Sequence, residues 1–177
     1  MDADRNWDRK FLADIKNDDL TELLFMHIRN IWSEDGLYFL GIEKRFGLDA
    51  AIEIDSEVWA VMGSIEARRL KRILGITKCR IPQLFSALKH STWWLNLEYK
   101  GYELEENRLV IRNKRCHVQI TREKKGLGEF GCKPVRTGFL NSFVKEFNPD
   151  IKVVCNVCPP DEHPKDLFCE WEFSIND

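Results

Sequence analysis

The sequence predicts an α+β fold, in which an N-terminal helical layer packs on a small antiparallel sheet. Three observations support this class. Up to Trp94, apolar residues recur three and four positions apart, as on one face of a helix. After Trp94 the period falls to two, which is typical of half-buried strands. The last elements follow a ββ-α-ββ-like order, so we expect a single domain over 1–177, helical over about 1–94 and sheet-containing over about 95–177.

Four helices are expected in the N-terminal half. The predicted ranges are 20–46, 48–54, 57–74 and 82–93. Gly47 is suited to a left-handed cap that ends the first helix. Asp55 or Ser56 is a suitable N-cap for the third helix, and Pro82 fits the first turn of the fourth.

The C-terminal half reads as strands around one helix. The predicted strands are 97–104, 109–112, 115–122, 151–158 and 167–174, and the predicted helix is 134–147. Polar turn residues separate the strands, and the glycine-rich stretch 124–131 (KKGLGEFG) predicts a mobile loop.

Composition excludes several classes of partner. The chain has 27 basic and 29 acidic residues and a net charge of −2, so no excess of positive charge points to nucleic acid or anionic lipid. No run of 18 apolar residues predicts a membrane span, and the charged N-terminus lacks an apolar signal core, so we expect a cytoplasmic protein. In that reducing compartment the six cysteines are expected to be thiols or metal ligands.

Three cysteines lie in the stretch CNVCPPDEHPKDLFCEW, at 155, 158 and 169. Strand alternation places Cys155 and Cys158 on opposite faces, and it places Cys169 with Trp171 on an apolar face. We therefore interpret Cys155 and Cys169 as core residues in a hairpin. A four-thiolate site that adds Cys132 and Cys158 to them stays an open alternative, which the divergent faces disfavour.

Cys132 and Cys158 each lie where an apolar run meets a turn. Cys132 comes just before the helix that Pro134 opens, and there the helix N-terminus and Lys133 favour a thiolate. Together with two residues of the DEHP turn they form a candidate metal site for zinc or iron. The candidate ligands are Cys132, Cys158, Asp161 and His163. Alternatively, these are buried thiols near a helix end and an exposed turn histidine.

Polar side chains interrupt the apolar face of the first long helix. Asp35 lies within that stripe, and a buried carboxylate is costly unless it is paired or hydrogen-bonded. One interpretation is an ion pair with Arg122 or Lys133, and the other is a polar anchor in an apolar ligand pocket. The candidate pocket residues are Trp32, Asp35, Phe39, Glu43 and Trp59, although aromatic residues that simply fill a core give the same pattern.

Three longer stretches resemble an uncharacterised prokaryotic family of unknown function. They are WSEDGLYFLGIEKRFGLDAAIEIDSEVW, RCHVQITREKKGLGEFGCK and CPPDEHPKDLFCEWEF, and the resemblance spans about 20–173. More distantly, the C-terminal half is similar to L-2-amino-thiazoline-4-carboxylic acid hydrolase-like proteins and to 4-vinyl-reductase-type ligand-binding domains. That similarity implies a helical layer on a small sheet that encloses a small-molecule cavity, and it transfers no activity.

Three functions follow as hypotheses. The first is a small-molecule-binding domain in which Asp35 and Glu43 orient a ligand against the aromatic residues, with Lys133 as a further ligand-binding residue. The second is a hydrolase of a small cyclic amide-like substrate, with Cys132 as nucleophile or metal ligand, His163 as general base and either Arg122 or Lys133 holding a carboxylate. The third is a structural metal-binding domain. The aromatic-rich helices are also candidates for a homodimer interface.

Overall fold

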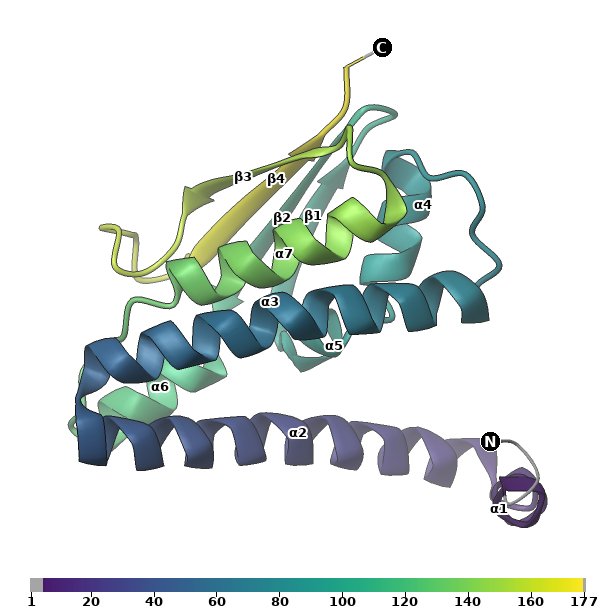
Figure 1. Cartoon of the computed structure of the whole chain (residues 1–177), viewed down its shortest axis with the longest axis horizontal. Helices are drawn as coiled ribbons and strands as arrows, with labels where there is room; N and C mark the ends of the chain where they lie inside the picture. Colours follow the sequence, from purple (N-terminus) through teal and green to yellow (C-terminus); the bar gives the residue numbers. More distant parts are fainter. Residues whose placement is uncertain (1–4, 177) are drawn as a thin grey trace.

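A computed structural model describes residues 5–176, and its α+β architecture confirms the predicted class (Figure 1). Long helices form layers below one face of a four-stranded sheet. The helices are α1 (Arg5–Ala13), α2 (Asn17–Phe46), α3 (Leu48–Ile73), α4 (Ile81–Leu88), α5 (Thr92–Asn96), α6 (His117–Lys124) and α7 (Lys133–Phe147). The strands are β1 (Tyr99–Leu104), β2 (Arg108–Arg115), β3 (Lys152–Val157) and β4 (Cys169–Ser174).

The sheet is antiparallel throughout, in the order β1-β2-β4-β3. Alternation in β4 buries Cys169, Trp171 and Phe173 against the helices, as the sequence predicts. The opposite face carries cross-strand ion pairs: Arg108 with Glu172, and Arg112 with Glu170. This face is therefore charged, and the core lies on the helical side.

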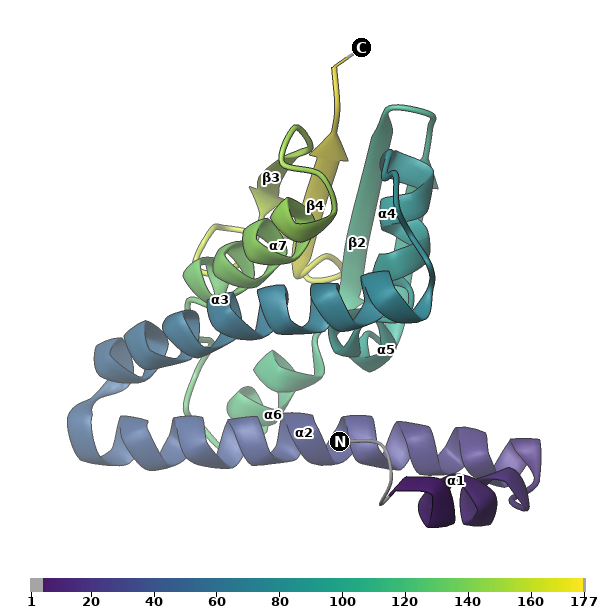
Figure 2. The same ribbon diagram turned by 45° about the vertical axis from the view of Figure 1, so that its right-hand side comes forward.

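The centre of the molecule is the contact between α3 and α7 (Figures 1 and 2). Small residues allow the two helices to approach closely. A Cβ atom on Gly63 would lie 2.4 Å from the carbonyl oxygen of Phe139, and one on Gly138 would lie 3.3 Å from the Cβ of Ala60. The helix α7 then buries its apolar stripe, from Phe139 to Phe147, between α3 and the sheet.

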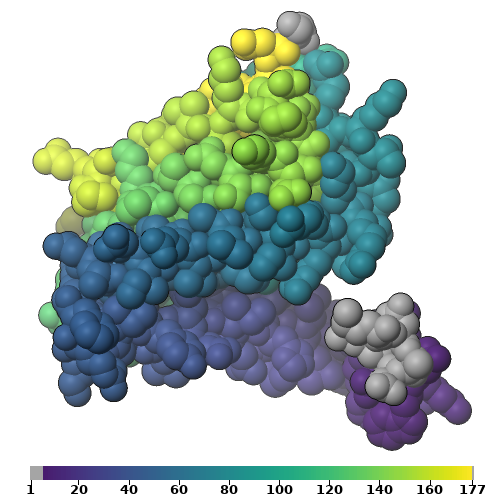
Figure 3. Space-filling model, viewed as in Figure 1, coloured from purple at the N-terminus to yellow at the C-terminus, as the bar shows by residue number. Residues whose placement is uncertain are grey.

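The helix α2 forms a separate outer layer, antiparallel to α3 and joined to it by the turn at Gly47. Gly47 has φ +90°, which the tight connection requires and which favours glycine. The helix α1 and the N-terminal part of α2 extend beyond the body of the molecule (Figure 3). Only two residues of α2, Ile28 and Phe39, are buried, so this helix contacts the rest of the chain loosely.

Three local predictions are wrong. The range 115–122, predicted as a strand, ends β2 and then forms α6, so two helices lie between the hairpins. The alternation of Cys116 with His117 suits a strand, but Cys116 is instead the N-cap of the short helix α6. The helices predicted over 48–54 and 57–74 are one continuous helix, since Asp55 and Ser56 lie inside it. The helix predicted over 82–93 is interrupted, and Ser91 caps α5 separately.

Across residues 5–176, none of the helices combines the length and apolar character needed to cross a membrane.

Candidate functional site

A cavity of about 370 Å³ lies between α2 and α6. Its size falls in the range of roughly 300–1,000 Å³ that is usual for small-molecule sites. The wall from α2 is largely apolar and includes Trp32, Phe39 and Leu40, while Thr121 and Arg122 contribute from α6. Gly36 also lines this cavity, and nothing lies within 4 Å of the position that its Cβ would occupy. We call this space the outer cavity.

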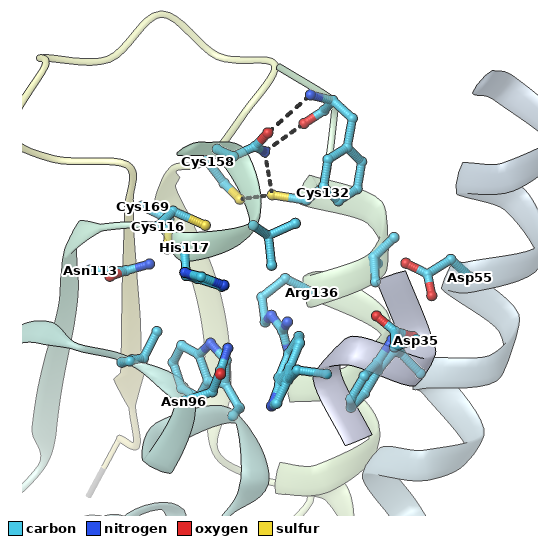
Figure 4. A pocket seen from close by; sticks show the side chains of 18 of the residues that line it. Asp35, Asp55, Asn96, Asn113, Cys116, His117, Cys132, Arg136, Cys158 and Cys169 are labelled. Atoms are coloured by element: carbon cyan, nitrogen blue, oxygen red, sulfur yellow. Dashed lines mark hydrogen bonds between the residues drawn. The ribbon is translucent and has the colours of Figure 1, made fainter. Parts of the chain in front are cut away.

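A smaller space of about 70 Å³ adjoins the outer cavity, deeper in the fold (Figure 4). We call it the inner chamber. The two spaces share lining residues from five parts of the chain: Trp32, Asp35, Asp55, Asn96, His117, Val118 and Phe130. The inner chamber adds the thiols of Cys132 and Cys158 and the guanidinium group of Arg136. Polar and reactive groups therefore concentrate at its inner end.

Asp35 from α2 and Asp55 from α3 form a carboxyl pair at the junction of the two spaces. The indole Nε1 of Trp59 donates a hydrogen bond of 2.9 Å to Asp35 Oδ1. Burial and then the adjacent charge of Asp35 raise the pKa of Asp55 to about 7. Burial also raises the pKa of Asp35, although the Trp59 hydrogen bond opposes this. At neutral pH the pair can therefore both donate and accept a hydrogen bond.

Arg136 from α7 faces this pair across the inner chamber. Its guanidinium group lies over four aromatic rings, at 5.3–5.6 Å from the centroids of Trp32, Trp59, Trp93 and Phe139. These contacts hold the cation in place by cation–π attraction. Its Nη1 atom is buried, and within residues 5–176 it has no hydrogen-bond partner. A buried donor without a partner is costly, so a ligand that accepts this hydrogen bond would gain accordingly.

An ion pair between Arg122 and Glu43 lies at the outer cavity, which Arg122 lines. Arg122, 4% exposed, donates from both Nη atoms to the carboxylate of Glu43 at 2.7 and 3.0 Å. Its Nε atom donates to the carbonyl of Gly128, and its guanidinium group lies near the rings of Phe39 and Phe130. The hydrogen bonds from Arg122 lower the pKa of Glu43. This pair ties α2 to α6.

The thiols gather more closely than strand alternation predicts. Cys132 Sγ and Cys158 Sγ are 3.6 Å apart, and Cys155 and Cys169 also interact with the Cys158 thiol. Cys155 and Cys158 do not diverge, because β3 has a register shift after Cys155 and ends at Val157. Hydrogen bonding with Cys158 lowers the pKa of Cys132 and raises that of Cys158.

Two of the predicted site residues have other partners nearby. Lys133 Nζ contacts Asp161 Oδ2 at 2.8 Å, and the same carboxylate accepts from the backbone N–H of Cys158. His163 Nε2 lies 3.0 Å from Glu129 Oε1, and its ring packs against Phe168. In the described part of the chain, no group of three or more His, Cys, Asp or Glu side chains is arranged to hold a metal ion.

Of the residues predicted to bind a ligand, Trp32, Asp35 and Phe39 line the outer cavity, and Trp59 lines the inner chamber. The side chains of Glu43 and Lys133 do not line either space and instead form the ion pairs described above.

Sequence reasoning missed Asp55, His117 and Arg136. Arg136 had a usable signal, since it precedes Phe139, Leu140 and Phe143 on the apolar stripe of a predicted helix. Asp55 is a suitable helix cap by sequence, because the preceding stretch resembles a separate helix, but the structure places it inside α3. His117 lies within the range predicted as a strand, and no sequence signal places its side chain at the cavity.

Comparison with known proteins gives a family without an activity. The sequence model of one protein family, described as a family of unknown function (DUF6125), matches residues 13–175 of the chain. The chain belongs to this family. No curated protein matches the sequence.

Proposed function

We propose that this member of the family binds a small, flat, partly apolar molecule in the outer cavity, with the polar edge of the ligand directed into the inner chamber. The observation that carries the proposal is the buried Arg136 Nη1 donor, which has no partner within the described residues. The aromatic wall of the outer cavity suits a ring, and a guanidinium donor at its inner end suits an acceptor atom.

The polar groups favour a ligand edge with one donor and one acceptor. Arg136 would donate to a ligand carbonyl, while the Asp35–Asp55 pair, with one carboxylate ionised, would accept from a ligand N–H. A fully anionic ligand is less suitable, because the carboxylates of Asp35 and Glu66 also lie near Arg136. Amides, lactams and cyclic amidines present the required edge.

Binding is favoured over hydrolysis by the positions of the predicted catalytic residues. Arg122 is held by Glu43, and His163 is held by Glu129, whereas Cys132 lines the inner chamber. The predicted hydrolase activity would also act on an amide-like ligand. The hydrolysis of a bound lactam can therefore be measured in the same samples as binding.

The proposal can be tested with 2-quinolone, a flat lactam with adjacent N–H and C=O groups. Binding is followed by the tryptophan indole resonances in ¹H–¹⁵N spectra, because Trp32 and Trp59 line the two spaces. We expect saturable shifts of these two indole signals. N-methyl-2-quinolone lacks the donor and should bind about tenfold more weakly, as expected for losing a hydrogen bond of about 1.4 kcal/mol.

A matched pair of variants locates the site. Gly36→Leu would place a branched side chain in the outer cavity from a position whose Cβ meets nothing within 4 Å, and it should abolish the shifts, whereas Gly36→Ala should retain them. Shifts that persist unchanged in Gly36→Leu, or equal binding of both quinolones, would contradict the proposed site. No indole shift in the unmodified protein at millimolar 2-quinolone would contradict the proposed ligand class.

A further inference from the structure

Cysteines from three segments converge at the inner chamber. Cys132 precedes α7, Cys158 follows β3 and Cys169 begins β4, and all three line the chamber. Figure 4 shows their sulfur atoms on the side of the chamber opposite the Asp35–Asp55 pair. Ligand binding as proposed above uses none of these thiols, so their convergence calls for a separate explanation.

Cys132 and Cys158 form the closest pair, with 3.6 Å between their sulfur atoms. A disulfide bond is about 2.05 Å long, so a displacement of roughly 1.5 Å, within reach of side-chain rotation, would join them. The backbone is already held in place for this, because the N–H of Lys133 donates to the carbonyl of Pro159 at 2.9 Å. The ion pair between Lys133 and Asp161 adds a second link between the same two segments.

The two thiols differ in the way that a reactive pair requires. Cys132 is partly exposed and lies at the N-terminus of a 15-residue helix, and Gln119 Nε2 donates to its sulfur at 3.6 Å. These features stabilise a thiolate. Cys158 is 1% exposed, and it interacts with three other sulfur atoms. The pKa of Cys132 is lowered and that of Cys158 is raised, in agreement with this asymmetry.

We propose that Cys132 and Cys158 are a redox-active dithiol that reduces small peroxides reaching the inner chamber. The chamber, at about 70 Å³, suits an oxidant of a few atoms, such as hydrogen peroxide, and excludes bulky disulfides. The inference does not depend on an organic ligand in the outer cavity.

The reaction has two steps. The Cys132 thiolate attacks one peroxide oxygen, so an S–O bond forms, the O–O bond breaks, and the leaving hydroxide takes up the proton that Cys132 released. The Cys158 sulfur then attacks the sulfenic sulfur of Cys132, which forms the S–S bond, breaks the S–O bond and releases a second water with the Cys158 proton. The two thiols lose two electrons, and the peroxide gains them.

The test uses the full chain, fully reduced and then treated with one equivalent of hydrogen peroxide. Remaining thiols are alkylated, and the peptides are mapped by mass spectrometry. We expect a Cys132–Cys158 disulfide as the main product, reversible by dithiothreitol. Cys79 is the internal reference, because burial raises its pKa to about 11. Cys132 should be lost at least about tenfold faster than Cys79.

Variants test the assigned order. In Cys158→Ser, Cys132 should stop at the sulfenic acid and react with dimedone, whereas Cys132→Ser should show no fast loss of thiols. Cys79→Ser is the control and should behave as the unmodified protein. The mapping in the unmodified protein stands even if a variant folds poorly.

Three results would overturn the inference. One is loss of Cys132 no faster than loss of Cys79. Another is a disulfide between a different pair of cysteines. The third is a stoichiometric metal ion that must be removed from these thiols before peroxide reacts, since the thiols would then be structural ligands.

Discussion

The α3–α7 contact and the α2–α6 contact differ in how closely their helices approach. Between α3 and α7, Gly63 leaves no room for a Cβ atom and Gly138 leaves little, and aromatic rings pack beside them. Between α2 and α6, the helices are joined by one ion pair and enclose a cavity of about 370 Å³. The first contact builds a rigid body, and the second leaves space for a ligand against that body.

The difference has a physical reason. Interiors pack densely when small and large residues alternate across the contact, and any added atom is then costly. The face of α2 that meets α6 instead carries Asp35 and Glu43, which have to remain hydrogen-bonded or ion-paired and therefore prevent close apolar packing. The open contact thus follows from polar groups on an apolar stripe.

The contact between α2 and α6, which we call the open contact, should be most sensitive to loss of the Glu43–Arg122 ion pair. Glu43→Gln leaves the buried Arg122 charge without its counter-ion, and we expect a loss of about 3 kcal/mol in the free energy of unfolding at pH 7. The pKa of Glu43 is lowered in the folded state, so the stability that its ionised form contributes is present above its unfolded pKa of about 4.5. That contribution is lost as the pH falls through the lower folded value.

Urea unfolding at pH 7 and pH 4 measures this difference. The gap between the unmodified protein and Glu43→Gln should narrow at the lower pH. Glu34→Gln on the exposed side of α2 is the control and should change stability by less than about 0.5 kcal/mol. A Glu43→Gln protein as stable as the control at pH 7 would show that the ion pair does not hold α2.

The contact between α3 and α7, which we call the close contact, should be destabilised when a methyl group is added at Gly63. Gly63→Ala places its Cβ 2.4 Å from the Phe139 carbonyl oxygen, a backbone atom that cannot move without shifting α7. We expect a loss of about 2 kcal/mol despite the better helix propensity of alanine. Chemical denaturation checks this value. A neutral or stabilising result would mean that α3 and α7 are not in the tight contact described.

The carboxyl pair between the two contacts should make stability fall as the pH rises. The pKa of Asp55 is raised to about 7, so the folded chain binds more protons than the unfolded chain between about pH 4 and 7. Asp55→Asn removes the free-energy cost of ionising Asp55 in the folded protein, and it should stabilise the protein by about 1–3 kcal/mol at pH 8. Near pH 4 the gain should vanish. Thermal melts at pH 4.5 and 8 measure it, and an equal gain at both values would exclude a raised pKa as the cause.

The smallest change in stability is expected at Gly36, where the contact between α2 and α6 leaves space for a side chain. Gly36→Ala adds a methyl group with nothing within 4 Å, inside a helix in which alanine is favoured over glycine. We expect a gain of about 0.5–1 kcal/mol in the free energy of unfolding. The same substitution at Gly63 should have the opposite sign, so this pair of variants measures the difference between the two contacts. Stability changes of the same sign for Gly36→Ala and Gly63→Ala would contradict the difference in packing between the two contacts.

The sequence predicted the parts of the fold that depend on local pattern. The stripes of α2 and α7 and the alternation of β4 follow from apolar spacing alone. The assignment failed over 115–122, because eight residues with mixed polarity suit a strand or a helix equally well by period. It also failed at Asp55, where a half-buried polar residue inside α3 looked like a helix cap.

Only the wall of the site that α2 forms could be predicted from the sequence. Trp32, Asp35 and Phe39 follow from one helix face, so they could be grouped from the sequence, and they do line the outer cavity. Arg136 and the thiol contacts come from segments that meet only in the tertiary fold. The approach of Cys155 to Cys158 depends on a register shift in β3, which no residue pattern in the strand announces.

The most direct measurement is a crystal structure of the protein with 2-quinolone. We expect the ring to lie between α2 and α6, its carbonyl oxygen to accept a hydrogen bond from Arg136 Nη1, and its N–H to face the Asp35–Asp55 pair. A 2-quinolone bound elsewhere, or α2 packed against α6 with no cavity and Arg136 Nη1 bonded to a protein group, would contradict it.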